Sequence, residues 1–246
     1  MSGEQAITLA TVKAMAEELA PRLGLPVPPI VASPDFHLSL AVITRPEGVA
    51  VAVSEGHPFL ERLDLRAAVA HELFHVLQLS QGFPLVYALE DPFNLAAQIQ
   101  NVVTDLDVTV RMQETDFGPE AELVTDHRLD GLADFHRTVE RYGFLPVITR
   151  LPLVSEEVTR CFPQHAARLA SVTETVRQAC PPEHWRASQE IAEVLGGLRF
   201  APGDSGLFPS VLEAYQRIFL ALSPAGRFSI VEPAVFLVVD AGKHLR

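Results

Sequence analysis

Residues 69–77 of this chain read VAHELFHVL. His71 and His75 are four positions apart, and Glu72 directly follows the first histidine. On an α-helix, side chains four positions apart lie on one face with Cβ atoms about 5–6 Å apart, so two imidazoles can share one tetrahedral metal ion. Glu72 lies beside that face, where its carboxylate can act on a water molecule at the metal. The spacing therefore predicts two metal ligands and a general base.

The neighbouring residues predict that this stretch is helical. Asp64 stands where an N-cap is expected, and residues 65–80 form a continuous helical run. Gly82 and Pro84 follow this run, as is typical of the end of a helix. One helix is therefore expected to carry both histidines and Glu72.

Residues before this helix predict one further helix and a small sheet. Residues 4–20 repeat apolar side chains at spacings of three and four, which indicates a helix with one buried stripe. Residues 30–53 contain an alternating run and a valine-rich run, which predict two or three strands with a turn at residues 45–48.

Residues after the motif helix are predicted to be mostly helical. A second long helix is expected to start at Asp91-Pro92, to run to about Glu114 and to stop at Gly118-Pro119. Further segments have helical patterns, and the last of the following is ambiguous between strand and helix: 120–142, 155–180, 183–195, 210–222 and 227–239. We expect an α+β fold with a core over residues 1–146 and a mostly helical region over 147–246, which can belong to the same domain.

The motif resembles the signature of the zincin metallopeptidases. Its inner residues, Leu73 and Phe74, are uncharged, and its flanks are apolar. The expected order of helix, strands, motif helix and second helix also resembles the zincin core, over about residues 4–116. The resemblance implies a hydrolase with one zinc ion per chain, in which Glu72 assists the attack of zinc-bound water on a peptide bond. The competing class is a non-catalytic regulatory or binding protein that retains a zinc-stabilised zincin fold.

A third zinc ligand has to be found outside the motif. The longer HExxHxxGxxH signature of the metzincins is absent, because Gln78 and Gln81 stand at its glycine and its third histidine. Gluzincins instead take a glutamate from the next helix. Around that predicted helix, polar residues form two stripes: Asn94, Gln98, Asn101 and Asp105, and separately Gln100, Thr104, Asp107 and Arg111.

The second stripe is expected to face solvent, because Asp107 and Arg111 have the spacing of an ion pair. The first stripe then faces the motif helix, and its acid Asp105 is the preferred third ligand, as in the aspzincins. If Asn101 occupies the gluzincin glutamate position, Asp105 would orient a histidine instead. Other candidates for the third ligand remain: Glu90, Asp107, Asp126, His127 and His136. Asn101, Gln98 and His127 are candidates for supporting the ligands or binding substrate.

Charge and composition narrow the class of partner. The net charge is −12, and the 19 lysines and arginines form no dense run, so nucleic acid is not an expected partner.

No apolar stretch approaches the roughly 18–20 residues of a membrane span, and no export signal is recognised. Two cysteines are too few for a disulfide framework, which favours a cytoplasmic protein. A peptide or protein substrate is expected, and residues 49–54 are the strand predicted to pair with it; the sequence indicates no oligomeric state.

Overall fold

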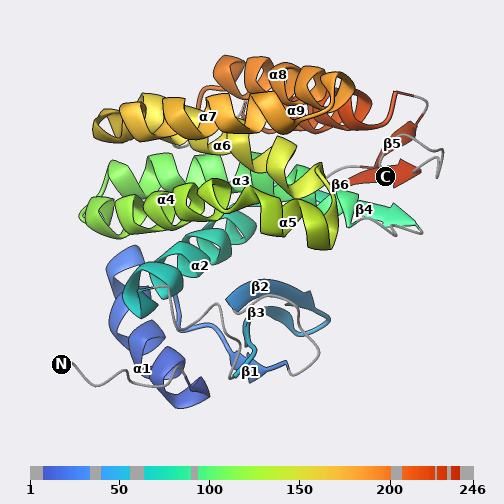
Figure 1. The fold of residues 1–246 in the computed structure, drawn as a ribbon. Helices are drawn as coiled ribbons and strands as arrows, with labels where there is room; N and C mark the ends of the chain where they lie inside the picture. The colour runs from blue at the N-terminus through green and yellow to red at the C-terminus, as the bar shows by residue number, and fades with distance from the viewer. Residues whose placement is uncertain are drawn as a thin grey trace. The chain divides into compact units, whose positions relative to one another are not determined.

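The computed structural model describes residues 8–33, 40–55, 64–89, 94–200, 207–224, 226–231 and 234–238. It has an α+β fold with many helices and, in the part described, two separate three-stranded mixed sheets (Figure 1). The chain divides into two compact units, one of residues 1–82 with 111–124 and the other of residues 83–110 with 125–246. This division differs from the boundary predicted at residues 146–147, which falls within a helix.

The first unit contains the motif helix and one of the sheets. Its elements are α1 (Leu9–Leu19), a short 3-10 turn (Ala20–Leu23), β1 (Ile30–Ala32), β2 (Leu40–Arg45), β3 (Gly48–Val53) and α2 (Leu65–Ser80). In this sheet β3 lies between β1, to which it is parallel, and β2, to which it is antiparallel. These elements confirm the predicted helix, strands and motif helix.

The β2–β3 hairpin has the turn predicted from the sequence. Arg45 pairs with Gly48, so Pro46 and Glu47 are the only residues between the two strands. Gly48 has a φ of +129°, a conformation that residues with a Cβ rarely adopt. Glycine at this position therefore allows the tight reversal that sets the register of the two strands.

The strand predicted to pair with a peptide substrate is not an edge strand. Residues 49–53 belong to β3, whose two sides are occupied by β1 and β2. Its backbone groups are therefore already used within the sheet, and the prediction for residues 49–54 was wrong. A valine-rich run shows that a strand is buried but does not show its position in the sheet. Among the described strands, β2 instead lies at an outer edge of this sheet.

The motif helix α2 begins and packs as its sequence predicts. The Asp64 carboxylate accepts a hydrogen bond of 2.9 Å from the backbone N–H of Ala67, which satisfies one donor of the first turn. Phe74 is buried on one face of α2, where its ring lies edge-on to Phe117 with the centroids 5.6 Å apart. Helix α1 packs against the same helix. This packing fixes the direction in which the motif side chains point.

The second unit contains most of the remaining helices and the other sheet. Its elements include β4 (Leu85–Leu89), most of α3 (Leu95–Gln113), part of α4 (Gly118–Ala133), α5 (Phe135–Tyr142), α6 (Leu145–Arg160), α7 (Ala166–Ala179), α8 (Pro182–Gly197), α9 (Leu207–Leu222), β5 (Arg227–Val231) and β6 (Ala234–Val238). In its sheet β6 lies between β4, parallel to it, and β5, antiparallel to it. Helix α8 packs against both α6 and α9.

Two helix boundaries in this region differ from the predictions. Gly118-Pro119 does not end the second long helix but begins α4, because proline is tolerated in a first turn, whose N–H groups have no helical partner. Helix α3 begins at Leu95, directly after Asn94, which has a φ of +54°. The predicted start at Asp91-Pro92 and the candidate ligand Glu90 lie outside the described residues.

Within the described part of the chain, the helices are all too short or too polar to span a bilayer.

Candidate metal centre

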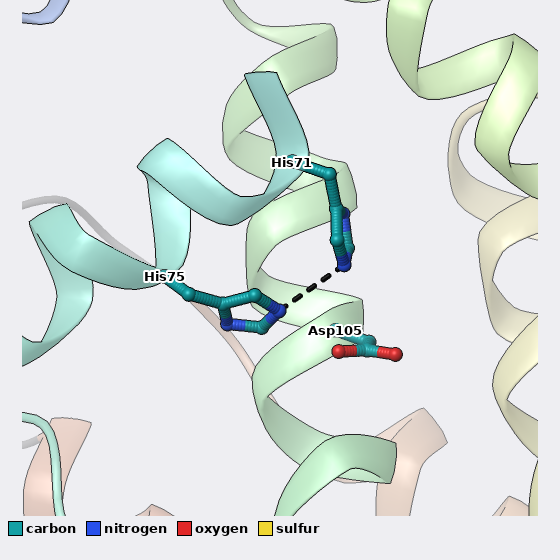
Figure 2. A group of neighbouring side chains, drawn as sticks. All are labelled: His71, His75 and Asp105. Atoms are coloured by element: carbon teal, nitrogen blue, oxygen red, sulfur yellow. Dashed lines mark hydrogen bonds between the residues drawn. The ribbon is translucent and has the colours of Figure 1, made fainter. Parts of the chain in front are cut away.

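The two motif histidines converge on one point beside α2. Their Nε2 atoms are 3.1 Å apart, and their rings meet edge to face with centroids 4.7 Å apart. His71 is 8% exposed, and His75 is half-buried. Figure 2 shows both imidazoles projecting from α2 toward each other, with the short contact dashed. Helical spacing alone brings the Cβ atoms together, whereas this arrangement also brings together the two nitrogens that can bind a metal.

The spacing of these nitrogens fits a zinc ion. With Zn–N bonds of about 2.0–2.1 Å and tetrahedral angles, two ligand nitrogens lie about 3.3 Å apart. The Nε2 atoms of His71 and His75 are 3.1 Å apart, so the ion requires only a small widening. Imidazole nitrogen with a carboxylate oxygen is also a ligand set that zinc accepts.

Gln78 supports His75 from the side opposite this contact. Its side chain is 1% exposed, and its Oε1 lies 2.9 Å from Nδ1 of His75. The two residues are three positions apart on α2, a spacing at which helical side chains meet. The sequence prediction missed Gln78, although a polar residue three positions after the second histidine was an available signal.

Glu72 is held against the edge strand β2. Its Oε2 accepts a hydrogen bond of 3.0 Å from the backbone N–H of Val42, and its side chain is half-buried. The N–H of Val42 therefore points away from β3 and toward the motif helix. The carboxylate therefore has a defined position against the backbone of β2.

Asp105 is the acid preferred from the sequence as the third ligand, and it is half-buried on α3. His71, His75 and Asp105 are the one set of potential ligands among the described residues that could hold a metal ion. Figure 2 shows Asp105 on α3. The Oδ2 atom of Asp105 also accepts a hydrogen bond of 2.7 Å from Nη2 of Arg128, which uses one of its two oxygens.

Arg128 connects Asp105 to a second, fully buried carboxylate. Glu157 is 0% exposed and accepts hydrogen bonds from Arg128, from Thr109 at 2.7 Å and from Thr125 at 3.2 Å. Burial raises the pKa of Glu157, whereas Arg128 and the two hydroxyls act in the opposite direction by stabilising the anion. Sequence reasoning missed Glu157, since the residues it contacts lie 29–48 positions away.

The polar stripe predicted to face solvent on α3 is largely buried. Asp107 is 0% exposed and Thr104 is 6% exposed. Oε1 of Gln100 accepts a hydrogen bond of 2.9 Å from the backbone N–H of Val86, which lies within β4. The stripe was predicted as a solvent face from an expected ion pair with Arg111, but it contributes polar groups to the interior of the helical packing instead. This prediction was wrong.

The remaining predicted site residues are placed as follows. Gln98 is half-buried and accepts a hydrogen bond of 3.1 Å from the hydroxyl of Thr149 on α6. Asn101 is exposed, and His127 is half-buried on α4. Neither Asp107 nor His127, both candidates for the third ligand, belongs to the set of described residues that could hold a metal ion. Their predicted roles in the site therefore rest on the sequence alone.

Three comparisons with known proteins found no relative. No protein-family model matches the sequence, and no curated protein and no solved structure matches the chain.

Proposed function

We propose that this protein is a zinc-dependent metallopeptidase with a zincin-like core. The observation that carries the proposal is the 3.1 Å approach of Nε2 of His71 to Nε2 of His75. Glu72 lies beside the first histidine on the same helix. Two metal ligands and a carboxylate base on a single helix are an arrangement that supports metal-assisted hydrolysis.

The proposed ligands are the three side chains His71, His75 and Asp105. Two imidazoles and one carboxylate leave a fourth position open, as catalytic zinc sites do. When bound there, zinc supplies a Lewis acid that polarises the scissile carbonyl and lowers the pKa of the attacking water. Arg128, which donates to Oδ2 of Asp105, holds that carboxylate in a fixed orientation.

Glu72 is the proposed general base. Its carboxylate takes a proton from the attacking water and then transfers it to the nitrogen of the leaving amine. The hydrogen bond from Val42 restricts the position of the carboxylate before substrate binds. Preorganisation of this kind reduces the reorganisation needed during the reaction.

The outer edge of β2 is the proposed site for the peptide substrate. In a strand, the backbone groups of alternate residues point to the same side, so Leu40 and Thr44 share the outward direction of Val42. An extended peptide can pair with these groups by backbone hydrogen bonds. Residues 49–53 cannot serve in this way, because β3 has a neighbour on both sides.

Metal content is the first test of the proposal. Elemental analysis of purified wild type is expected to give about one zinc per chain. His75→Ala is expected to lose the zinc, and Asp105→Asn is expected to weaken its binding, while His165→Ala, which replaces another half-buried histidine, serves as a matched control and retains it. A folded wild type that takes up no zinc contradicts the proposal.

Hydrolysis is tested with zinc-loaded protein and a broad peptide library. Wild type is expected to cleave peptides, and Glu72→Gln is expected to keep its zinc while losing roughly 10²–10⁴-fold in rate, because only the proton transfer is removed. Zinc binding without any difference in cleavage between these two proteins would favour the non-catalytic alternative.

A further inference from the structure

We propose that Gln78 is a positioning residue that selects the tautomer of His75 in which Nε2 can bind the metal. This inference rests on the proposed zinc site, because it concerns how one of the proposed ligands is prepared. Gln78 does not reach the metal itself: its Oε1 contacts Nδ1 of His75, whereas the proposed ligand atom of that ring is Nε2. Its effect therefore passes through His75.

The hydrogen bond between these residues determines where the imidazole proton lies. A neutral imidazole has one N–H and one lone pair, and an amide oxygen can only accept a hydrogen bond. Oε1 of Gln78 is 2.9 Å from Nδ1 of His75, so Nδ1 carries the proton. The lone pair is then on Nε2, which lies 3.1 Å from Nε2 of His71.

The opposite orientation of the Gln78 amide would disable the ligand. If the amide nitrogen faced Nδ1, that atom would have to accept and the ring proton would move to Nε2. An Nε2–H group directed into the site cannot bind a metal ion. The orientation with Oε1 toward His75 is therefore the one that is competent for metal binding.

The burial of Gln78 strengthens its preference for the tautomer of His75 that is protonated at Nδ1. Gln78 is 1% exposed, so water does not readily replace its oxygen as the partner of Nδ1. Removing the acceptor would deprive the Nδ1–H group of His75 of this hydrogen bond. Because Gln78 is on α2 with His75, the ligand and its support keep their relation whenever this helix is folded.

The choice of glutamine at position 78 also affects the basicity of His75 as a metal ligand. Carboxylates commonly take this place in metal sites and raise the basicity of the histidine, and loss of such partners typically costs 10–100-fold in metal affinity. The neutral oxygen of Gln78 selects the same tautomer with weaker polarisation. Gln78→Glu is therefore expected to bind zinc more tightly than wild type, and Gln78→Leu about 10–100-fold more weakly.

The first experiment is nitrogen-15 NMR of histidine in the zinc-free protein at about pH 8, where ordinary imidazoles are neutral. Wild type is expected to show His75 protonated at Nδ1. Gln78→Leu is expected to shift His75 toward the Nε2-protonated form, and circular dichroism establishes that the variant is folded. This measurement does not depend on zinc, so it tests the role of Gln78 even if the metallopeptidase proposal fails.

The second experiment measures the zinc dissociation constant by competition with a chelator. Gln81→Leu is the matched control, since Gln81 lies three residues further along and accepts its hydrogen bond from Arg111 instead. The expected order of affinity is Gln78→Glu, then wild type and Gln81→Leu, then Gln78→Leu. A folded Gln78→Leu with the wild-type tautomer and the wild-type affinity overturns the inference, whereas absence of zinc from every variant overturns the proposed function alone.

Discussion

The carboxylate of Glu157 shows how a single residue can organise the region around Asp105. It is fully buried and accepts hydrogen bonds from Arg128, Thr109 and Thr125. Arg128 also donates to Asp105, so it bridges two acids. A buried charge is tolerated only when such partners compensate it, and removal of one partner leaves the others unsatisfied.

Glu157→Leu is expected to destabilise the protein by about 3 kcal/mol, because it leaves the Arg128 guanidinium and two hydroxyls without their acceptor. Glu157→Gln is expected to cost less, since its amide oxygen still accepts hydrogen bonds. Urea unfolding followed by circular dichroism measures both values. Equal losses in the two variants would show that the three donors do not depend on an acceptor at this position.

At the site, the sequence predicted the residues that lie together on one helix. The positions of His71, Glu72 and His75 follow from helical geometry, which needs no knowledge of the rest of the fold. Asp105 was selected as the acid in a polar stripe of the next helix, and its role as a ligand stays a prediction. Gln78 was missed because it was considered only as a departure from a longer motif.

At the scale of elements, local sequence signals predicted helix boundaries correctly, whereas the pairing of strands far apart in the sequence was not predicted. The bounds of α2 were predicted correctly, since Asp64 and Gly82 act within one turn of its ends. Strand β4 was not predicted, because its partner β6 lies about 150 residues further along the chain. The prediction that one polar stripe of α3 faces solvent was wrong. A helical pattern separates the faces of a helix, but it does not show which face another element covers.

The N-cap of α2 gives a prediction at this scale. Asp64→Ala is expected to lower the free energy of unfolding by about 1 kcal/mol, because the N–H of Ala67 loses the side-chain acceptor at 2.9 Å. Asp64→Ser is the control, since serine caps about as well. Urea unfolding measures both. If the alanine variant is as stable as the serine variant, the cap contributes nothing to the stability of the motif helix.

At the scale of the whole molecule, the chain alternates between its two compact units. The unit boundaries at residues 110–111 and 124–125 fall inside α3 and α4, so these two helices contribute residues to both. A ligand that binds only the folded state stabilises it by mass action. The proposed zinc ion should therefore raise the temperature at which the protein unfolds, and thermal unfolding can detect this without any substrate.

Zinc at about 100 times its dissociation constant is expected to stabilise the folded state by about 2.7 kcal/mol. For a chain of this size, that corresponds to a rise in Tm of roughly 5–10 °C. Differential scanning calorimetry measures the rise. A chelator should reverse the effect, and magnesium should not reproduce it, because magnesium prefers oxygen ligands to imidazole. In His75→Ala the rise should disappear; a rise of the same size in that variant would mean that zinc stabilises the protein at some other place.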